Sequence, residues 1–125
     1  MKFFTAINCM DGRVQLPVIE YLLKRFNVTY VDMITEPGPN LILANQIESD
    51  MVQSVFNRID ISIDKHKSVG IAVVGHHDCV GNPSDKEQQK IHTLKAIQVI
   101  KQKFSDIEII GLWVDENWQV NEIRK

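Results

Sequence analysis

The chain has 125 residues, 44% of them hydrophobic and 24% charged, which are ordinary values for one globular domain and exclude a disordered or collagen-like protein. Its 14 lysine and arginine residues stand against 16 aspartate and glutamate residues, so the formal net charge of -2 provides no basic field for a nucleic acid or an anionic membrane. No stretch approaches the roughly 20 apolar residues of a membrane-spanning helix. We expect no secretion signal in the first residues, because Asn8, Asp11 and Arg13 interrupt their apolar run. We expect one cytoplasmic domain over residues 1–125.

The first half of the chain predicts strands that alternate with helices. The apolar run Lys2 to Cys9 predicts a first strand, residues 16–26 carry apolar side chains at helical spacing, and residues 28–34 predict a second strand. The following TEPGPN stretch, residues 35–40, predicts a stiff loop that continues neither neighbouring element. From about Asn45 to His66, apolar residues at three- and four-residue steps predict a long helix, which could break near residues 60–64.

The second half repeats the alternation. Residues 68–75 form the most strand-like stretch of the chain, and a helix should follow with the apolar face Ile91, Leu94, Ile97, Ile100 and Phe104. Residues 107–114 predict a further strand, and the tail after them could add a short strand or pack on a neighbour. Such alternation favours an α/β fold, a three-layer sandwich with a mostly parallel central sheet of four or five strands and helices on both faces.

Three potential metal ligands come at the ends of two predicted strands. Cys9 ends the first strand, and the sequence HHDC after the third contains His76 and Cys79. Ligands of parallel sheets bind beyond the carboxyl ends of the strands, so the three side chains should converge if the strands are neighbours. Two thiolates and one imidazole suit zinc, and three protein ligands leave a fourth position open, as in catalytic zinc sites.

The two cysteines also have other interpretations. They could be small buried core residues, or they could form a redox disulfide, although neither has the Cys-X-X-Cys spacing of an oxidoreductase. Two cysteines are too few for a disulfide framework. Their position beside the other motif residues favours metal binding.

A carboxylate and a guanidinium follow the first cysteine, in the sequence CMDGR. Asp11 and Arg13 are spaced to lie on the same side of an extended turn, where Arg13 can hold the carboxylate in one orientation. Asp11 could then accept a hydrogen bond from a hydroxide on the zinc, or it could swing and occupy the fourth zinc position, which would close the site. An ordinary surface ion pair is the alternative. For His77 and Asp78, roles in proton transfer or hydrogen bonding and a simple solvent-facing turn remain open, and Gly75 indicates a close backbone approach beside the metal.

The motifs CMDGR and GHHDC resemble the Cys-X-Asp-X-Arg and His-X-X-Cys motifs of the β-class carbonic anhydrases. The resemblance implies one zinc ion per chain held by Cys9, His76 and Cys79, with Asp11 and Arg13 as the catalytic pair that orients the nucleophile. It further implies reversible hydration of carbon dioxide to bicarbonate by a zinc-bound hydroxide, and a homodimer or a higher homo-oligomer with sites near the interface.

The sequence also departs from the family pattern. The given chain begins almost at the first strand, without the N-terminal helices that typically embrace a partner subunit, and ITEPGPN replaces the usual Arg-Asn-Ala-Gly loop. VGNP replaces the glycine-rich run after the second zinc cysteine. The resemblance is therefore to a compact, divergent member, and two other functions stay open. One is a zinc hydrolase of carbonyl sulfide or carbon disulfide, and the other is a non-catalytic zinc protein in which Asp11 is a permanent fourth ligand.

Overall fold

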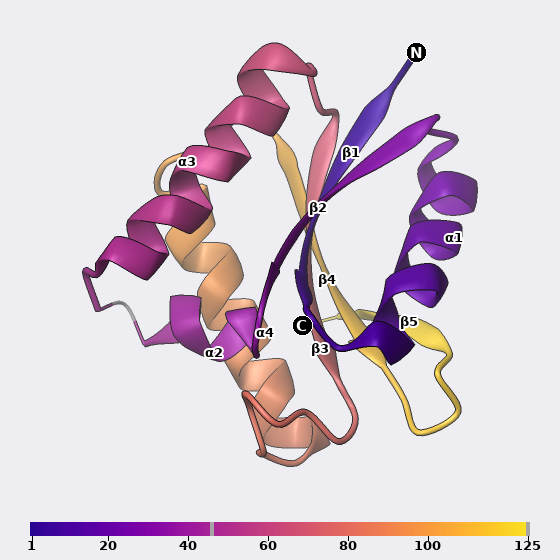
Figure 1. Ribbon diagram of the computed structural model, residues 1–125, viewed down its shortest axis with the longest axis vertical. Helices are drawn as coiled ribbons and strands as arrows, with labels where there is room; N and C mark the ends of the chain where they lie inside the picture. The colour runs from indigo at the N-terminus through magenta and orange to yellow at the C-terminus, as the bar shows by residue number, and fades with distance from the viewer. Residues whose placement is uncertain (46, 125) are drawn as a thin grey trace.

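The computed structural model describes residues 1–45 and 47–124 and contains a five-stranded sheet with the strand order β2-β1-β3-β4-β5 (Figure 1). The strands, in chain order, are β1 (Phe3–Cys9), β2 (Tyr30–Glu36), β3 (Gly70–His76), β4 (Glu108–Val114) and β5 (Val120–Ile123). Strands β1 to β4 are parallel, and β5 pairs with β4 in the antiparallel direction. The tail after residue 114 therefore forms a short strand, β5, which is one of the two possibilities that the sequence left open.

Helices cover both faces of this sheet (Figure 1). A short 3-10 turn, η1 (Gly12–Val14), leads into α1 (Gln15–Phe26), which lies on one face; α2 (Pro39–Ala44), α3 (Asp50–Lys65) and α4 (Lys86–Lys101) lie on the other. The predicted three-layer α/β sandwich with a mostly parallel sheet is confirmed. Within the described residues, no helix is both long enough and apolar enough to cross a membrane.

The alternation of side chains along the central strands divides the core into two layers. In β3, Ala72 and Val74 pack in the cluster that contains Val18 and Leu22 of α1. The residues between them face the opposite layer, where buried apolar residues of the strands pack with those of α2, α3 and α4, namely Ile7, Ile34, Leu43, Val52, Val55, Ile59, Ile71, Val73, Ala96 and Ile100. Burial on both faces explains why β3 reads as a continuous apolar run.

The structure corrects the predicted loop at residues 35–40. Strand β2 continues through Glu36, and Pro39 opens the short helix α2. Proline is tolerated at this position because the first N–H groups of a helix have no partner within the helix. Gly38, at φ 59°, lets the backbone turn between the two elements.

Two helix predictions also change. The helix expected from Asn45 begins only at Asp50, where the Ser49 side chain accepts a hydrogen bond from the Val52 N–H, and it continues without a break through Lys65. In α4, Ile91 is 45% exposed, whereas the buried positions are Gln89, Thr93, Ala96 and Ile100. The buried face of α4 therefore differs from the predicted apolar face. Gln89 and Thr93 can be buried on it because both have buried hydrogen-bonding partners.

Candidate metal centre

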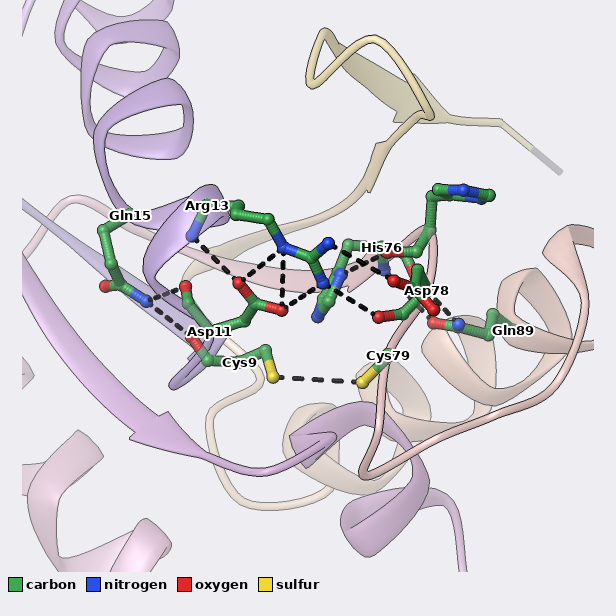
Figure 2. Close-up of polar contacts among 9 residues, drawn as sticks. Cys9, Asp11, Arg13, Gln15, His76, Asp78, Cys79 and Gln89 are labelled. Atoms are coloured by element: carbon green, nitrogen blue, oxygen red, sulfur yellow. Dashed lines mark hydrogen bonds and ion pairs between the residues drawn. The ribbon is translucent and has the colours of Figure 1, made fainter.

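The three residues expected to bind zinc lie together at the carboxyl edge of the sheet. Cys9 is the last residue of β1 and His76 the last of β3, and these strands are parallel neighbours; Cys79 follows three residues later. Their ligand atoms all lie within 4.8 Å of one another, and each residue is at most 5% exposed. In Figure 2 the two sulfur atoms face each other beside His76.

One nitrogen of His76 is available to a metal. Its Nδ1 lies 2.7 Å from the carbonyl oxygen of His77, and because a carbonyl only accepts, Nδ1 carries the proton and donates it. The Nε2 atom is then a lone-pair donor, and among the described residues it is the single buried side-chain nitrogen or oxygen without a hydrogen-bond partner. A buried polar atom left unpaired destabilises a fold, and a metal ion would satisfy it.

The two cysteines form a thiol pair that favours a soft metal. Their Sγ atoms are 3.9 Å apart, almost twice a disulfide bond length of about 2.05 Å, and both cysteines are free. A hydrogen bond from the Cys79 thiol lowers the pKa of Cys9, whereas the same hydrogen bond and burial raise the pKa of Cys79. Cys9 therefore loses its proton more readily than Cys79. A bound cation would favour loss of the Cys79 proton as well, because it stabilises the second thiolate.

Asp11 is held by Arg13 through several hydrogen bonds. Arg13 Nη2 donates to Asp11 Oδ2 at 2.7 Å, Nε donates to Oδ1 at 3.0 Å, and the Arg13 backbone N–H also donates to Oδ1 at 2.9 Å. The side-chain hydrogen bond from Arg13 lowers the pKa of Asp11 to about 2. The carboxylate is thus ionised at neutral pH, and it does not belong to the cluster formed by Cys9, His76 and Cys79.

Arg13 itself is fixed by residues from two other segments. Its Nη1 donates to Asp78 Oδ2 at 3.3 Å and its Nη2 to the Asp78 carbonyl oxygen at 3.1 Å, so it joins the two motif loops (Figure 2). The guanidinium also lies over the Trp118 ring, 4.5 Å from its centroid. Asp78 adopts a left-handed conformation with φ 57°, which aspartate tolerates better than most residues. Asp78 lies in a solvent-facing turn, with its side chain 70% exposed, and it also accepts hydrogen bonds from Arg13.

The turn after Cys9 has a further support from α1. Gln15 Nε2 donates to the carbonyl oxygen of Cys9 at 2.6 Å and to that of Asp11 at 3.0 Å. This amide spans the turn that carries both residues, as Figure 2 shows. The sequence analysis did not identify Gln15 or Trp118, because their roles depend on contacts that no motif encodes.

A cleft of about 370 Å³ opens beside Cys79. Its lining is mostly polar or charged and includes His77, Asp78 and Lys86, with Trp113 as an aromatic wall. Of the three candidate metal ligands, Cys79 lines this cleft.

The chain was compared with known proteins. The model of a family described as "Putative carbonic anhydrase" matches residues 1–124. A search of the curated proteins gives no match. Among solved structures, a carbonic anhydrase from Streptococcus mutans is similar with a TM-score of 0.64 and 16% identity, over 97% of this chain and 81% of that one.

Two further solved structures give the same picture. A tetrameric β-carbonic anhydrase from Sordaria macrospora matches with a TM-score of 0.63 and 13% identity, over 98% of this chain and 80% of that one. β-Carbonic anhydrase isoform I of Trichomonas vaginalis matches with a TM-score of 0.54 and 17% identity, over 96% and 81%. At such identities the likeness concerns the fold. Because the family model matches nearly the whole sequence and the fold is that of β-carbonic anhydrases, the chain belongs to the carbonic anhydrase family.

Proposed function

We propose that residues 1–125 form one zinc-dependent enzyme domain that catalyses the reversible hydration of carbon dioxide to bicarbonate. In this proposal Cys9, His76 and Cys79 hold one zinc ion, and Asp11 with Arg13 forms the catalytic pair. The observation that carries it is the buried Nε2 atom of His76, which lacks a hydrogen-bond partner and lies beside two cysteine sulfurs. Family membership supports the same reaction.

The chemistry of the donor set fits zinc. Two soft thiolates and one neutral imidazole are typical zinc ligands, and the bond from His76 Nδ1 to a carbonyl is the outer support that such ligands usually have. When bound, zinc supplies Lewis acidity, which brings the pKa of a water to about 7 and so yields a nucleophile at neutral pH.

Asp11 would orient the attacking water. Its carboxylate is ionised and fixed by Arg13, so it can accept a hydrogen bond from the water and direct a lone pair toward the carbon of carbon dioxide. Addition of water to carbon dioxide gives bicarbonate and one proton, which passes to the solvent. The bonds from Arg13 favour this arrangement over a closed site in which Asp11 would be the fourth ligand.

The test is stopped-flow carbon dioxide hydration by protein of verified zinc content, near pH 7 and near pH 9. We expect activity that disappears when a chelator removes zinc and returns when zinc is restored. Asp11→Asn should retain zinc and lose roughly 100-fold in kcat/KM, because the water is no longer oriented. Asp64→Asn, an exposed carboxylate change on α3, is the matched control and should keep the activity.

Other outcomes would decide for the alternatives. Protein with one zinc per chain that hydrolyses carbonyl sulfide or carbon disulfide, and not carbon dioxide, would be a zinc hydrolase of these related molecules. Protein inactive on all three, in which Asp11→Asn weakens zinc binding, would have a non-catalytic zinc site closed by Asp11.

We further infer that the enzyme is a homodimer or a higher homo-oligomer and that it works in the cytoplasm. The tetrameric state of the Sordaria macrospora enzymes supports the first inference. The second rests on the two free cysteines, which must stay reduced to bind a metal.

A further inference from the structure

The side-chain amide of Gln89 pairs with the backbone of the proposed zinc ligand His76. The His76 N–H donates to Gln89 Oε1 at 3.2 Å, and Gln89 Nε2 donates to the His76 carbonyl oxygen at 2.8 Å. One amide thus satisfies both backbone groups of the residue, as a neighbouring strand would. Strand β1 does not do so, because its register with β3 extends only from Thr5–Ile71 to Ile7–Val73.

The same amide reaches the loop that follows Cys79. Gln89 Nε2 also lies 3.1 Å from the carbonyl oxygen of Asn82 and 3.3 Å from that of Ser84. Gln89 is therefore a direct connection between the end of β3, which carries His76, and the loop after the second cysteine. Figure 2 shows its side chain extending from α4 toward these segments.

A buried polar cluster holds Gln89 in this position. Asn40 Nδ2 donates to Gln89 Oε1 at 3.3 Å and to Thr93 Oγ1 at 3.2 Å, and Asn82 Nδ2 donates to Asn40 Oδ1 at 3.2 Å. All four residues are at most 1% exposed. Because their polar side-chain atoms have partners, the cluster is of the fully satisfied kind that makes a core rigid.

The cluster packs directly against Gly75, the residue before His76. A Cβ atom at Gly75 would lie 2.8 Å from Asn40 Nδ2 and 2.9 Å from Gln89 Oε1, so only glycine fits without displacing the amides. The sequence analysis expected a close backbone approach at Gly75, and the approach is made by this cluster. The strand end that carries His76 is thus held by its backbone and by direct packing.

We infer that Gln89 is a positioning residue of the metal centre: its amide fixes the backbone of His76 relative to the Cys79 loop and so sets the affinity and geometry of the metal site. The inference rests on the proposed metal site, although it does not depend on which substrate is used. Gln89 acts through backbone groups and contacts neither the ligand atoms nor the substrate. Loss of outer support of this kind typically weakens metal binding 10- to 100-fold.

The test compares Gln89→Met, which keeps a similar volume and removes the amide, with Gln98→Met, the same change at an exposed position of α4. Zinc affinity is measured by competition with a chelator, and ligand geometry by the visible absorption of the cobalt(II)-loaded protein. We expect Gln89→Met to bind zinc 10- to 100-fold more weakly with a shifted cobalt spectrum, and Gln98→Met to match the wild type. Unchanged zinc affinity and cobalt spectrum in Gln89→Met, even with a lower melting temperature, would show a merely structural role.

Two further measurements keep the inference open to refutation if Gln89→Met does not fold. Gln89→Glu keeps the acceptor for the His76 N–H but, as a carboxylate, loses both donors, and the same changes in affinity and spectrum are expected. In the metal-free wild type, the His76 amide should exchange slowly with deuterium, and rapid exchange would overturn the inference. A wild type that binds zinc without hydrating carbon dioxide would refute the proposed reaction alone, whereas a wild type that binds neither zinc nor cobalt would refute both.

Discussion

At the scale of single residues, Arg13 is the side chain that connects the two motifs. Its guanidinium donates to Asp11 in one motif and to Asp78 in the other, and it lies over the Trp118 ring. These contacts need a planar group whose five N–H donors point in different directions. The ammonium group of a lysine cannot make the same set of hydrogen bonds. The identity of this residue therefore matters more than its charge.

Arg13→Lys should lower kcat/KM roughly 100-fold, because Asp11 loses the two guanidinium hydrogen bonds that orient it. The zinc content should stay at the wild-type level. The kinetics and metal content of purified protein provide the measurement. Asp78→Asn is the matched comparison, since it removes only the ion pair at 3.3 Å from a side chain that is 70% exposed. Pairs this exposed contribute about 1 kcal/mol at most, so this variant should stay within a few-fold of the wild type. Equal losses of kcat/KM in the two variants would contradict the role given to the hydrogen bonds from Arg13 to Asp11.

The site residues that could be predicted from the sequence are those that belong to short motifs. Cys9, His76 and Cys79 were expected to meet because each comes at or just after the end of a predicted strand, and the structure brings them together. Gln89 and Trp118 could not be found in this way. Their partners are 13 and 105 residues distant in the chain, and a glutamine or tryptophan has no spacing rule that would indicate such contacts.

At the scale of elements, α1 is fastened to the edge strand β5 through one carboxylate. The Tyr21 hydroxyl donates to Glu122 Oε2 at 2.5 Å, and Arg25 Nε donates to the same oxygen at 2.9 Å. Burial, followed by the bond to Glu122, raises the pKa of Tyr21 to about 12, and the bond from Tyr21 lowers the pKa of Glu122. Both shifts stabilise the folded state around neutral pH.

Tyr21→Phe should lower the free energy of unfolding by about 1.5 kcal/mol at pH 7, the usual loss for a hydrogen bond to a charged group. Because the folded-state pKa of Tyr21 is raised above its ordinary value, its contribution is complete below about pH 10 and disappears as the pH rises through about 12. The stabilities of wild type and variant should therefore converge over this range in urea unfolding. Tyr30→Phe, which changes the exposed second tyrosine, serves as the control. A difference that stays constant from pH 7 to 12 would exclude this coupling.

The start of α2, which the sequence analysis placed in a loop, is fixed by a contact between two backbones. A Cβ atom at Gly81 would lie 2.6 Å from the backbone nitrogen of Gly38, so the loop after Cys79 packs directly on the start of α2. Such a contact between two backbones fixes Pro39 as a helix start, although the local sequence is typical of a loop. Tertiary packing overrode local preference here, and only the fold could show it.

At the scale of the whole molecule, the candidate metal centre lies at the point where the strand order reverses. From β1 the chain moves outward to β2, and from β3 it moves outward to β4 on the other side, so β1 and β3 separate at their carboxyl ends. Crevices of this kind are the usual ligand sites of open parallel sheets. The position of the site could therefore be predicted from topology, once the alternation of strands and helices was recognised.

For the proposed homo-oligomer, the residues next to the candidate site give a testable location of the interface. Met10, Leu16 and Val80 are 62%, 63% and 93% exposed, and each is next in sequence to a residue of the site or of its support, namely Cys9, Gln15 or Cys79. We predict that these exposed apolar side chains are buried when two copies of the chain associate.

We expect light scattering at micromolar concentration to show a dimer or a larger homo-oligomer. Val80→Glu should shift this assembly toward the monomer, because the interface would have to bury an unpaired charge. Ile61→Glu, at an exposed position of α3, places the same charge on an apolar residue away from the crevice and should leave the assembly intact. A monomeric wild type would refute the assembly, and an unchanged Val80→Glu oligomer would place the interface elsewhere. If both predictions hold, the partner subunit covers the rim of the metal site, and activity should fall on dilution together with the oligomer.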